Sequence, residues 1–275
     1  MNIMREILPS DSLAQVPIIY LHDEANHAVI MEDAGPAAMN LKELLKRPNP
    51  PSPTAGATIG RVLGEFIARL HVWGKTDQAR ASLDFFEGHP QARDICAWAM
   101  YDRLVDTITG KSEPIPLIHD PPLQVTSEEL DKISKFAEER AVEMRTSRET
   151  MTMGDFWTGN VLVELDWGGD GSEKLRKILV VDWEVARPGV AAFDVGQFQA
   201  EVFTVQHFNP VCGPAGKALN AAFVEGYLSI QPELDRQKAA QHLATHLVIW
   251  VPRAGWEPAE KTRALVEHGL RSITL

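Results

Sequence analysis

Hydrophobic and polar positions divide the chain into short apolar runs near its start, an apolar pair at its centre and helical segments elsewhere. Ile18–Leu21 and Ala28–Met31 flank the polar turn His22–Asn26, which predicts an antiparallel hairpin. A second hairpin is predicted from the apolar runs Val161–Leu165 and Lys177–Val181, with the glycine-rich stretch between them as its loop. Strands are therefore expected in only two places.

The remaining apolar positions mostly recur with helical spacing. Leu41–Leu45 indicates a short helix, and Thr54–Trp73 a longer one with apolar residues three and four apart. Glycines at 56, 60 and 64 are costly on an exposed helix, so we expect close neighbours along this helix. Further helices are predicted over Gln91–Thr107, Ser127–Thr146, Phe193–Val205, Ala215–Ile230, Glu233–Val251 and Pro258–Ser272.

Two isolated hairpins among helices predict an α+β fold. The 275 residues suffice for a substantial core, and 44% hydrophobic with 24% charged residues is typical of a soluble globular protein. Ala34-Gly35-Pro36 interrupts the strand pattern, which predicts a boundary between a small segment, 1–35, and a helical segment, 36–275.

Charge and cysteine content limit the partners and the compartment. A net charge of −11 argues against nucleic acid, whose phosphates need a basic surface. The same charge is compatible with a cationic substrate, and solubility explains it about as well. Cys96 and Cys212 provide no disulfide framework, and each is expected to be a small buried residue. No secretory signal or membrane-spanning run is visible, so we expect a cytoplasmic protein.

The candidate chemistry lies around the central hairpin. Asp155 is followed five residues later by Asn160, which leads into the apolar run, and Asp182 ends the second run. Phosphoryl transfer needs such groups, with one carboxylate at the acceptor hydroxyl and an amide and a carboxylate oxygen to hold Mg²⁺ against nucleotide phosphates. The alternatives are a loop aspartate that caps a turn and an asparagine that bonds backbone groups at a strand start.

These segments resemble the aminoglycoside phosphotransferase and choline-kinase-like family of the protein-kinase-like fold. Met153–Val163 is similar to the family's catalytic loop, and Val180–Glu184, followed by Asp194-Val195-Gly196, is similar to its metal-binding segment. Ala28–Asp33 resembles its hinge strand, and Ile59–His71 resembles a helix that carries a Leu-Gly and a Leu-His pair. The resemblance extends over most of the chain.

The resemblance implies a kinase that transfers the γ-phosphoryl group of ATP to a hydroxyl of a small metabolite. It places Asp155 at the acceptor hydroxyl, assigns Mg²⁺ to Asn160 and Asp182, and makes Asp194 a structural brace of the loop. Adenine would bond to the backbone of Glu32, Asp33 and Ala34. Trp157 and Glu184 are candidates for the substrate pocket, with a core position and a solvated surface position as their respective alternatives.

Two departures from the family pattern bear on activity. The family carries a glycine-rich loop and a strand lysine before its hinge, whereas residues 1–16 contain neither Gly nor Lys, and Glu6 could at most be the lysine's partner. Met153 stands where the family usually has His. We therefore expect a kinase-type large lobe with a remnant small lobe, impaired in catalysis, or alternatively an inactive pseudokinase-like binding or scaffold protein. Edge strands near the start predict self-association.

Two other features are not expected to bind ligands. His242 and His246 lie four residues apart, but without an obvious third ligand they do not predict a zinc site. The glycine-rich stretch Trp167–Gly171 joins two strands, and no helix follows it to bind a phosphate.

Overall fold

A computed structural model describes residues 1–273, and the chain folds into two compact units. Unit 1 consists of Met1–Trp73, Trp157–Trp183 and Asn209–Glu233. Unit 2 consists of Gly74–Phe156, Glu184–Phe208 and the chain from Leu234 onward. The structure is a mixture of helices and short strands, as an α+β fold requires. The predicted division into 1–35 and 36–275 concerns lobes of a kinase-type chain and stays a prediction.

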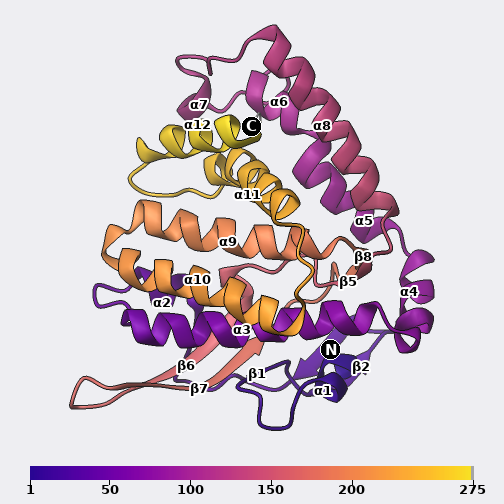
Figure 1. Cartoon of the computed structure of the whole chain (residues 1–275), viewed down its shortest axis with the longest axis vertical. Coiled ribbons are helices and arrows are strands. Elements are labelled where there is room, and N and C mark those ends of the chain that lie inside the picture. The colour runs from indigo at the N-terminus through magenta and orange to yellow at the C-terminus, as the bar shows by residue number, and fades with distance from the viewer. Residues whose placement is uncertain (274–275) are drawn as a thin grey trace. The chain divides into compact units, whose positions relative to one another are not determined.

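Unit 1 contains a four-stranded sheet in the order β1-β7-β6-β4. Its centre is the predicted hairpin, formed by β6 (Val161–Trp167) and β7 (Glu173–Val180), which is the long arm in Figure 1. β4 (Ala38–Asn40) pairs antiparallel with β6, and β1 (Ala14–Gln15) pairs parallel with β7. The prediction of this hairpin is confirmed, and both strands extend beyond the predicted runs towards their connecting loop.

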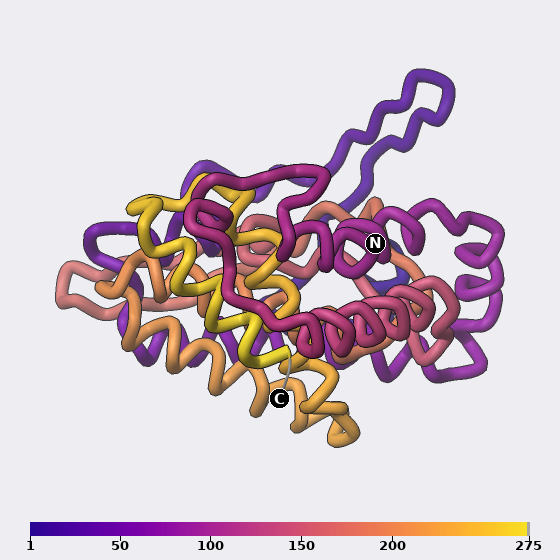
Figure 2. Tube along the Cα trace, turned by 90° about the horizontal axis from the view of Figure 1, so that it is seen from above, coloured from indigo at the N-terminus to yellow at the C-terminus, as the bar shows by residue number. Residues whose placement is uncertain are grey.

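The predicted first hairpin is also confirmed, as β2 (Ile19–Asp23) and β3 (Ala28–Met31). These two strands form a sheet of their own. Figure 2 shows them as an indigo pair that extends away from its neighbours in the chain. Several of their apolar side chains are exposed, among them Tyr20 at 63% and Ile30 at 54%. This exposure is the physical basis for the expected self-association, which stays a prediction.

The long helix of unit 1, α3 (Pro53–Gly74), packs closely against α10 (Gly213–Ile230). A Cβ atom at Gly60 would overlap the backbone carbonyl of Leu219 on α10, and glycines one turn before and after it make similar contacts. The expectation that these glycines allow close neighbours is confirmed. His71 and Tyr227 join the same two helices by a buried hydrogen bond of 2.9 Å.

Unit 1 also contains α1 (Asn2–Ile7), α2 (Leu41–Lys46) and two 3₁₀ turns, η3 (Thr158–Asn160) and η4 (Pro210–Cys212). Unit 2 is mainly helical. Its helices are α4 (Arg80–Glu87), α5 (Gln91–Ala97), α6 (Leu104–Thr109), α7 (Pro116–His119), α8 (Ser127–Thr146), α9 (Ala191–Phe208), α11 (Arg236–Trp250) and α12 (Lys261–Ile273), with 3₁₀ turns η1 (Asp77–Ala79) and η5 (Val251–Arg253).

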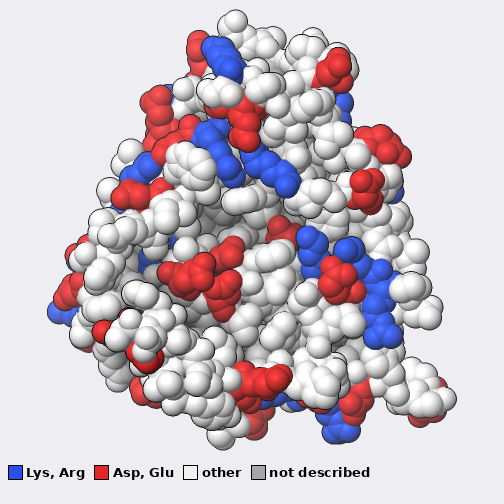
Figure 3. Space-filling view, turned by 180° about the vertical axis from the view of Figure 1, so that it is seen from behind, with Lys and Arg blue, Asp and Glu red and all other residues white. Residues whose placement is uncertain are grey.

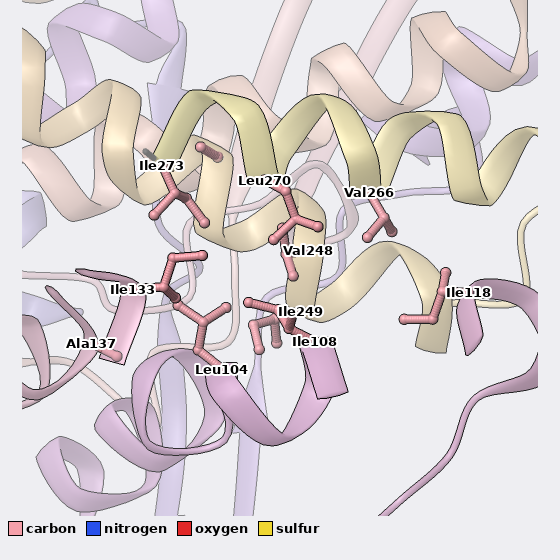
Figure 4. Packing of buried hydrophobic residues seen from close by; sticks show 11 residues of the cluster. Leu104, Ile108, Ile118, Ile133, Ala137, Val248, Ile249, Val266, Leu270 and Ile273 are labelled. Carbon is pink, nitrogen blue, oxygen red and sulfur yellow. The ribbon is translucent and has the colours of Figure 1, made fainter. Parts of the chain in front are cut away.

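Apolar side chains from five helices of unit 2 form a common core, shown in Figure 4. Leu104 and Ile108 of α6 meet Ile133 of α8, Val248 of α11 and Val266 of α12. Each of these side chains is less than 5% exposed. Helices that are distant in the sequence are thereby held together by burial of apolar surface.

The prediction of a single helix over Gln91–Thr107 is wrong. The π-helical turn η2 (Trp98–Asp102) separates α5 from α6. A π turn inserts one residue into the helical period. The apolar spacing on either side remains helical, and hydrophobic periodicity alone therefore does not reveal the insertion.

Unit 2 also contains a pair of strands that the sequence did not indicate. β5 (Thr150–Thr152) and β8 (Arg187–Gly189) pair antiparallel, with Thr152 opposite Arg187. At three residues each, these strands are too short to show an alternating pattern. They place the candidate catalytic loop directly after β5.

Basic and acidic side chains both lie on the surface, and the expectation that the protein does not bind nucleic acid stays a prediction. On the face drawn in Figure 3, basic side chains lie in groups, and acidic side chains lie beside them. Within residues 1–273, no helix has both the length and the apolar sequence needed to cross a bilayer.

Candidate active site

The loop that contains Asp155 is held by the first turn of α9. Asp194 accepts hydrogen bonds from the backbone N–H groups of Met153, at 2.8 Å, and Gly154, at 2.9 Å. The Asp194 carboxylate is 1% exposed, and charge-assisted bonds to backbone donors offset the cost of burying it. Such contacts are what a brace of the loop requires.

Gly154 permits the sharp turn of this loop. Its φ of +83° lies in the left-handed region that favours glycine. A Cβ atom there would overlap the Arg187 guanidinium and the Val185 carbonyl. The backbone therefore passes close to the segment before β8, and a larger residue would displace Asp155.

Asp155 is half-buried and bonded to Gln197, a residue that the sequence motifs do not include. The side-chain amide of Gln197 on α9 donates a hydrogen bond of 2.8 Å to its Oδ1 atom. Gln197 lies three residues after Asp194, and residues at this spacing share a helix face. The three-residue spacing from Asp194 is the only sign in the sequence that Gln197 could contact the loop. It becomes informative only once Asp194 is known to face the loop.

Asp155 lines a cavity of about 190 Å³ whose lining residues all belong to unit 2. Asp194, Glu184 and Gln197 also line it. The other lining residues are Ile95, Cys96, Ala99, Met100, Met144, Gly154, Val185, Arg187, Phe193, His242 and Trp250. The contributions from α5, η2 and α11 were not indicated by sequence, because these segments are far from the motif in the chain.

Asn160 and Asp182 lie at one end of the β6–β7 hairpin in unit 1. Val161 pairs with Val180, and the N–H of Val181 donates to the Asn160 carbonyl at 3.0 Å. Asn160 is thus opposite Val181, and Asp182 is the next residue. The register brings together the two residues predicted to bind the metal.

Asp182 has an unusual backbone conformation. Its φ is +65°, which is uncommon for a residue other than glycine. Backbone strain of this kind costs about 1–3 kcal/mol and clusters at functional sites. Trp183 supports the turn, because its indole N–H donates to the Val180 carbonyl at 3.0 Å and its ring packs on Phe66.

The side-chain oxygens of Asn160 and Asp182 suit Mg²⁺ better than a metal ion whose ligands all come from protein side chains. Within residues 1–273, no group of three or more His, Cys, Asp or Glu residues could hold a metal ion. Mg²⁺ typically takes one or two protein oxygens and completes its shell with water and substrate phosphates. An amide oxygen and a carboxylate meet that requirement.

The predicted adenine segment follows β3 in unit 1. The Glu32 N–H already donates to the Ile18 carbonyl at 2.8 Å, and its side chain forms an ion pair with Lys177. The hydrogen bond from Lys177 is the main reason that the pKa of Glu32 is lowered. Asp33 accepts from the Gly35 N–H at 2.7 Å, and Ala34 lies between them. Because the Glu32 N–H is already bonded, its backbone carbonyl is the group that would accept a hydrogen bond from adenine.

The two candidate pocket residues lie in different units. Glu184 lines the cavity of unit 2, whereas Trp157 lies in unit 1, where Lys42 Nζ is 5.5 Å from its ring centroid. Phe156, expected in the core, is fully buried and stacks on Phe198. The functional roles proposed for Trp157 and Glu184 stay predictions.

The two histidines of α11 have other partners. His242 Nδ1 is 2.7 Å from the Tyr101 hydroxyl, and His246 Nε2 is 2.8 Å from Glu201. Both histidines are 2% exposed. Both histidines therefore belong to buried hydrogen-bonded pairs.

Comparison with known proteins identifies kinases as relatives. No family model matches the chain. A 4-hydroxytryptamine kinase of Psilocybe cyanescens is 29% identical over 265 residues, which are 96% of this chain and 67% of that protein. A 4-hydroxytryptamine kinase of Psilocybe cubensis is 27% identical over 271 residues, 98% of this chain and 69% of that protein. The chain spans about two thirds of the length of both relatives.

A solved glucosamine kinase structure resembles the chain only weakly, with a TM-score of 0.44, 14% identity and coverage of 94% of this chain and 65% of that chain. The similarity to the two tryptamine kinases, which runs over nearly the whole chain, supports a fold of the small-molecule kinase type. Membership of the aminoglycoside phosphotransferase and choline-kinase-like family stays a prediction.

Proposed function

We propose that the protein transfers the γ-phosphoryl group of ATP to a hydroxyl of a small molecule. The observation that carries the proposal is the position of Asp155, whose carboxylate lines a cavity while Gln197 bonds its Oδ1 atom and Asp194 braces its loop. A carboxylate held in this way at a cavity suits the handling of an acceptor hydroxyl. Similarity to two small-molecule kinases along nearly the whole chain supports the same reaction type.

Asp155 is the group that engages the acceptor. It accepts the proton of the acceptor hydroxyl as the bond from that oxygen to the γ-phosphorus forms and the bond to the β-phosphate oxygen breaks. The proton goes to Asp155 and the leaving group is ADP. Catalysis of this kind depends on positioning and charge stabilisation, with no covalent enzyme intermediate.

Asn160 and Asp182 would hold Mg²⁺ at the end of the β6–β7 hairpin. When bound, Mg²⁺ neutralises phosphate charge and orients the phosphates for transfer. Adenine would bond to backbone groups in the segment Glu32–Ala34. Asp194 acts on the reaction through the backbone of the loop.

The acceptor is proposed to be a hydroxylated small molecule with a positive charge. The relatives are named for 4-hydroxytryptamine, which makes this compound the first acceptor to test. The net charge of −11 is compatible with a cationic acceptor.

Thermal unfolding with and without millimolar MgATP tests nucleotide binding. A ligand at about 100 times its dissociation constant adds about 2.7 kcal/mol of stability, which is a readily measured shift. We expect this shift for the unchanged chain, its loss in Asp182→Ala, and its retention in Asp170→Ala, a control in the exposed hairpin loop. An equal shift in all three proteins would exclude Asp182 as a metal ligand.

Phosphoryl transfer itself is tested by mass spectrometry of 4-hydroxytryptamine incubated with the protein and MgATP. We expect phosphorylated product with the unchanged chain and none with Asp155→Asn, which should keep the MgATP shift. A MgATP shift without any product, over a range of hydroxylated amines, would contradict the enzyme proposal and favour a pseudokinase-like binding protein.

A further inference from the structure

We propose that the cavity of unit 2 selects acceptors with a flat aromatic ring that carries both a hydroxyl and a positively charged group. The inference rests on the proposed phosphotransferase function, because Asp155 lines the same cavity. It goes beyond that function by naming the groups that recognise the part of the acceptor that does not react. These groups are Met100, Trp250 and Glu184.

Met100 and Trp250 form an apolar wall of the cavity. The indole N–H of Trp250 donates to the Met100 sulfur at 3.2 Å. Because an indole has only one donor and no acceptor, this contact leaves Trp250 only its ring surface for a ligand. Ring surfaces and thioether sulfur favour aromatic partners.

The guanidinium of Arg103, which is not among the residues that line the cavity, packs against the Trp250 ring. The Arg103 guanidinium carbon is 4.9 Å from the ring centroids of both Trp98 and Trp250. Arg103 is fixed in turn by a hydrogen bond of 2.9 Å from its Nε to the Ala99 carbonyl. A ring held in advance costs little entropy when a ligand packs against it.

The π-helical turn η2 places residues of this wall. Ala99 and Met100, in the middle of the turn, line the cavity, while the next residue, Tyr101, is fully buried and bonded to His242. π turns are rare and occur frequently at functional sites. The turn therefore indicates that this wall serves binding in addition to packing.

Acidic groups outnumber basic ones around the cavity. Asp155, Glu184 and Asp194 line it, and Arg187 is its one basic lining residue among those described, apart from His242. Burial, with smaller effects of His246 and Arg187, holds the pKa of His242 well below its usual value, so this histidine is neutral at pH 7. The balance of charge favours a ligand that carries an ammonium group.

The size of the cavity limits the ligand. Its volume of about 190 Å³ is smaller than the 300–1,000 Å³ of pockets for drug-sized ligands, which suits one small ring system. An amino sugar of similar size has several hydroxyls to satisfy, and the Met100–Trp250 wall offers them no hydrogen bonds. Polar groups without partners weaken binding strongly.

Isothermal titration calorimetry of the full chain without nucleotide tests the inference with three probes. 4-Hydroxytryptamine carries the ring, the hydroxyl and the amine, whereas 4-hydroxyindole lacks the amine and glucosamine lacks the aromatic ring. We expect 4-hydroxytryptamine to bind at least about tenfold more tightly than either of the others. No binding of 4-hydroxytryptamine, or equal binding of glucosamine, would overturn the proposal.

Two variants with matched controls locate the recognition. Glu184→Gln should weaken binding of 4-hydroxytryptamine about tenfold and leave that of 4-hydroxyindole unchanged. Trp250→Leu should weaken both aromatic probes, and Trp250→Phe, which keeps a ring, should restore most of the affinity. Glu149→Gln and Trp167→Leu, both outside the cavity, should bind as the unchanged chain does. Unaltered affinity in Glu184→Gln and Trp250→Leu would overturn the assignment.

The binding experiment separates this inference from the proposed reaction. Binding of 4-hydroxytryptamine that depends on Glu184 and Trp250, with no phosphorylated product in the presence of MgATP, would support the recognition site and contradict the phosphotransferase. Product formation that is insensitive to both variants would support the phosphotransferase and overturn the recognition site.

Discussion

The side-chain amide of Gln197 donates a hydrogen bond of 2.8 Å to Oδ1 of Asp155. The same helix, α9, supplies Asp194, which accepts from the N–H groups of Met153 and Gly154. One face of one helix thereby holds both the backbone of the loop and the orientation of its carboxylate. The family that the loop resembles usually has His at the position of Met153, and here the buried Asp194 holds the Met153 backbone directly.

Replacing Gln197 should affect turnover more than binding. In Gln197→Met the side chain keeps its length but loses the hydrogen bond, so the Asp155 carboxylate is no longer fixed in rotation. We expect kcat for the proposed reaction to fall about 10- to 100-fold with KM nearly unchanged, as measured by steady-state kinetics. Gln206→Met, on the same helix with its amide bonded to the Val202 carbonyl, is the control and should retain kcat. A rise in KM with unchanged kcat would mean that Gln197 contacts the acceptor instead.

Replacing Asp194 should lower stability. In Asp194→Asn one carboxylate oxygen becomes an NH₂ group that faces a backbone N–H, which leaves buried donors unsatisfied. We expect a loss of about 2 kcal/mol in the free energy of unfolding, measured by urea denaturation. Asp235→Asn should cost almost nothing, because Asp235 is the exposed N-cap of α11 and asparagine is an equally good cap. Equal effects of the two substitutions would show that the Asp194 contacts contribute little.

Adding one methyl group between α3 and α10 should also lower stability. The Cβ atom in Gly60→Ala would overlap the Leu219 carbonyl, so the helices would have to move apart. We expect a loss of about 1–3 kcal/mol in the free energy of unfolding. Gly213→Ala is the control, since no atom of the described residues lies within 4 Å of its added Cβ and its backbone is helical. That change should be neutral or stabilise by up to about 1 kcal/mol.

His242 should make stability depend on pH. Burial lowers the pKa of His242 well below the 6.5 of an unperturbed histidine, so the unfolded chain binds a proton that the folded chain does not. The contribution is therefore fully present above about pH 6.5 and is lost as pH falls, by up to about 1.4 kcal/mol per pH unit. Urea denaturation at several pH values between about 7.5 and about 5.5 measures the free energy of unfolding as a function of pH. This free energy should fall less steeply with decreasing pH for His242→Gln than for the unchanged chain. Identical slopes would indicate that His242 titrates normally.

Features of the chain that depend on residues close in sequence could be predicted. Short apolar runs beside turn residues identified β2, β3 and the β6–β7 hairpin, and apolar residues three and four apart identified most helices. The segment Asp155–Asn160 and Asp182 led to the hypothesis of phosphoryl transfer, because few side chains bind metal ions or protons, and the site roles of these residues stay predictions. The glycines of α3 indicated close packing, since only helix contact repays their cost.

Other features required the tertiary structure. The π turn η2 inserts a residue between two segments that each keep helical spacing, and β5 pairs with β8 across more than 30 residues with strands too short to show a pattern. The contact of Gln197 with Asp155 and the wall of Met100 and Trp250 join residues 42 and 150 positions apart. Local sequence determined which ionisable and metal-binding side chains the candidate loop contains, because these follow directly from residue types. Packing of distant helices decided which side chains surround Asp155, because burial of apolar surface depends on the whole fold.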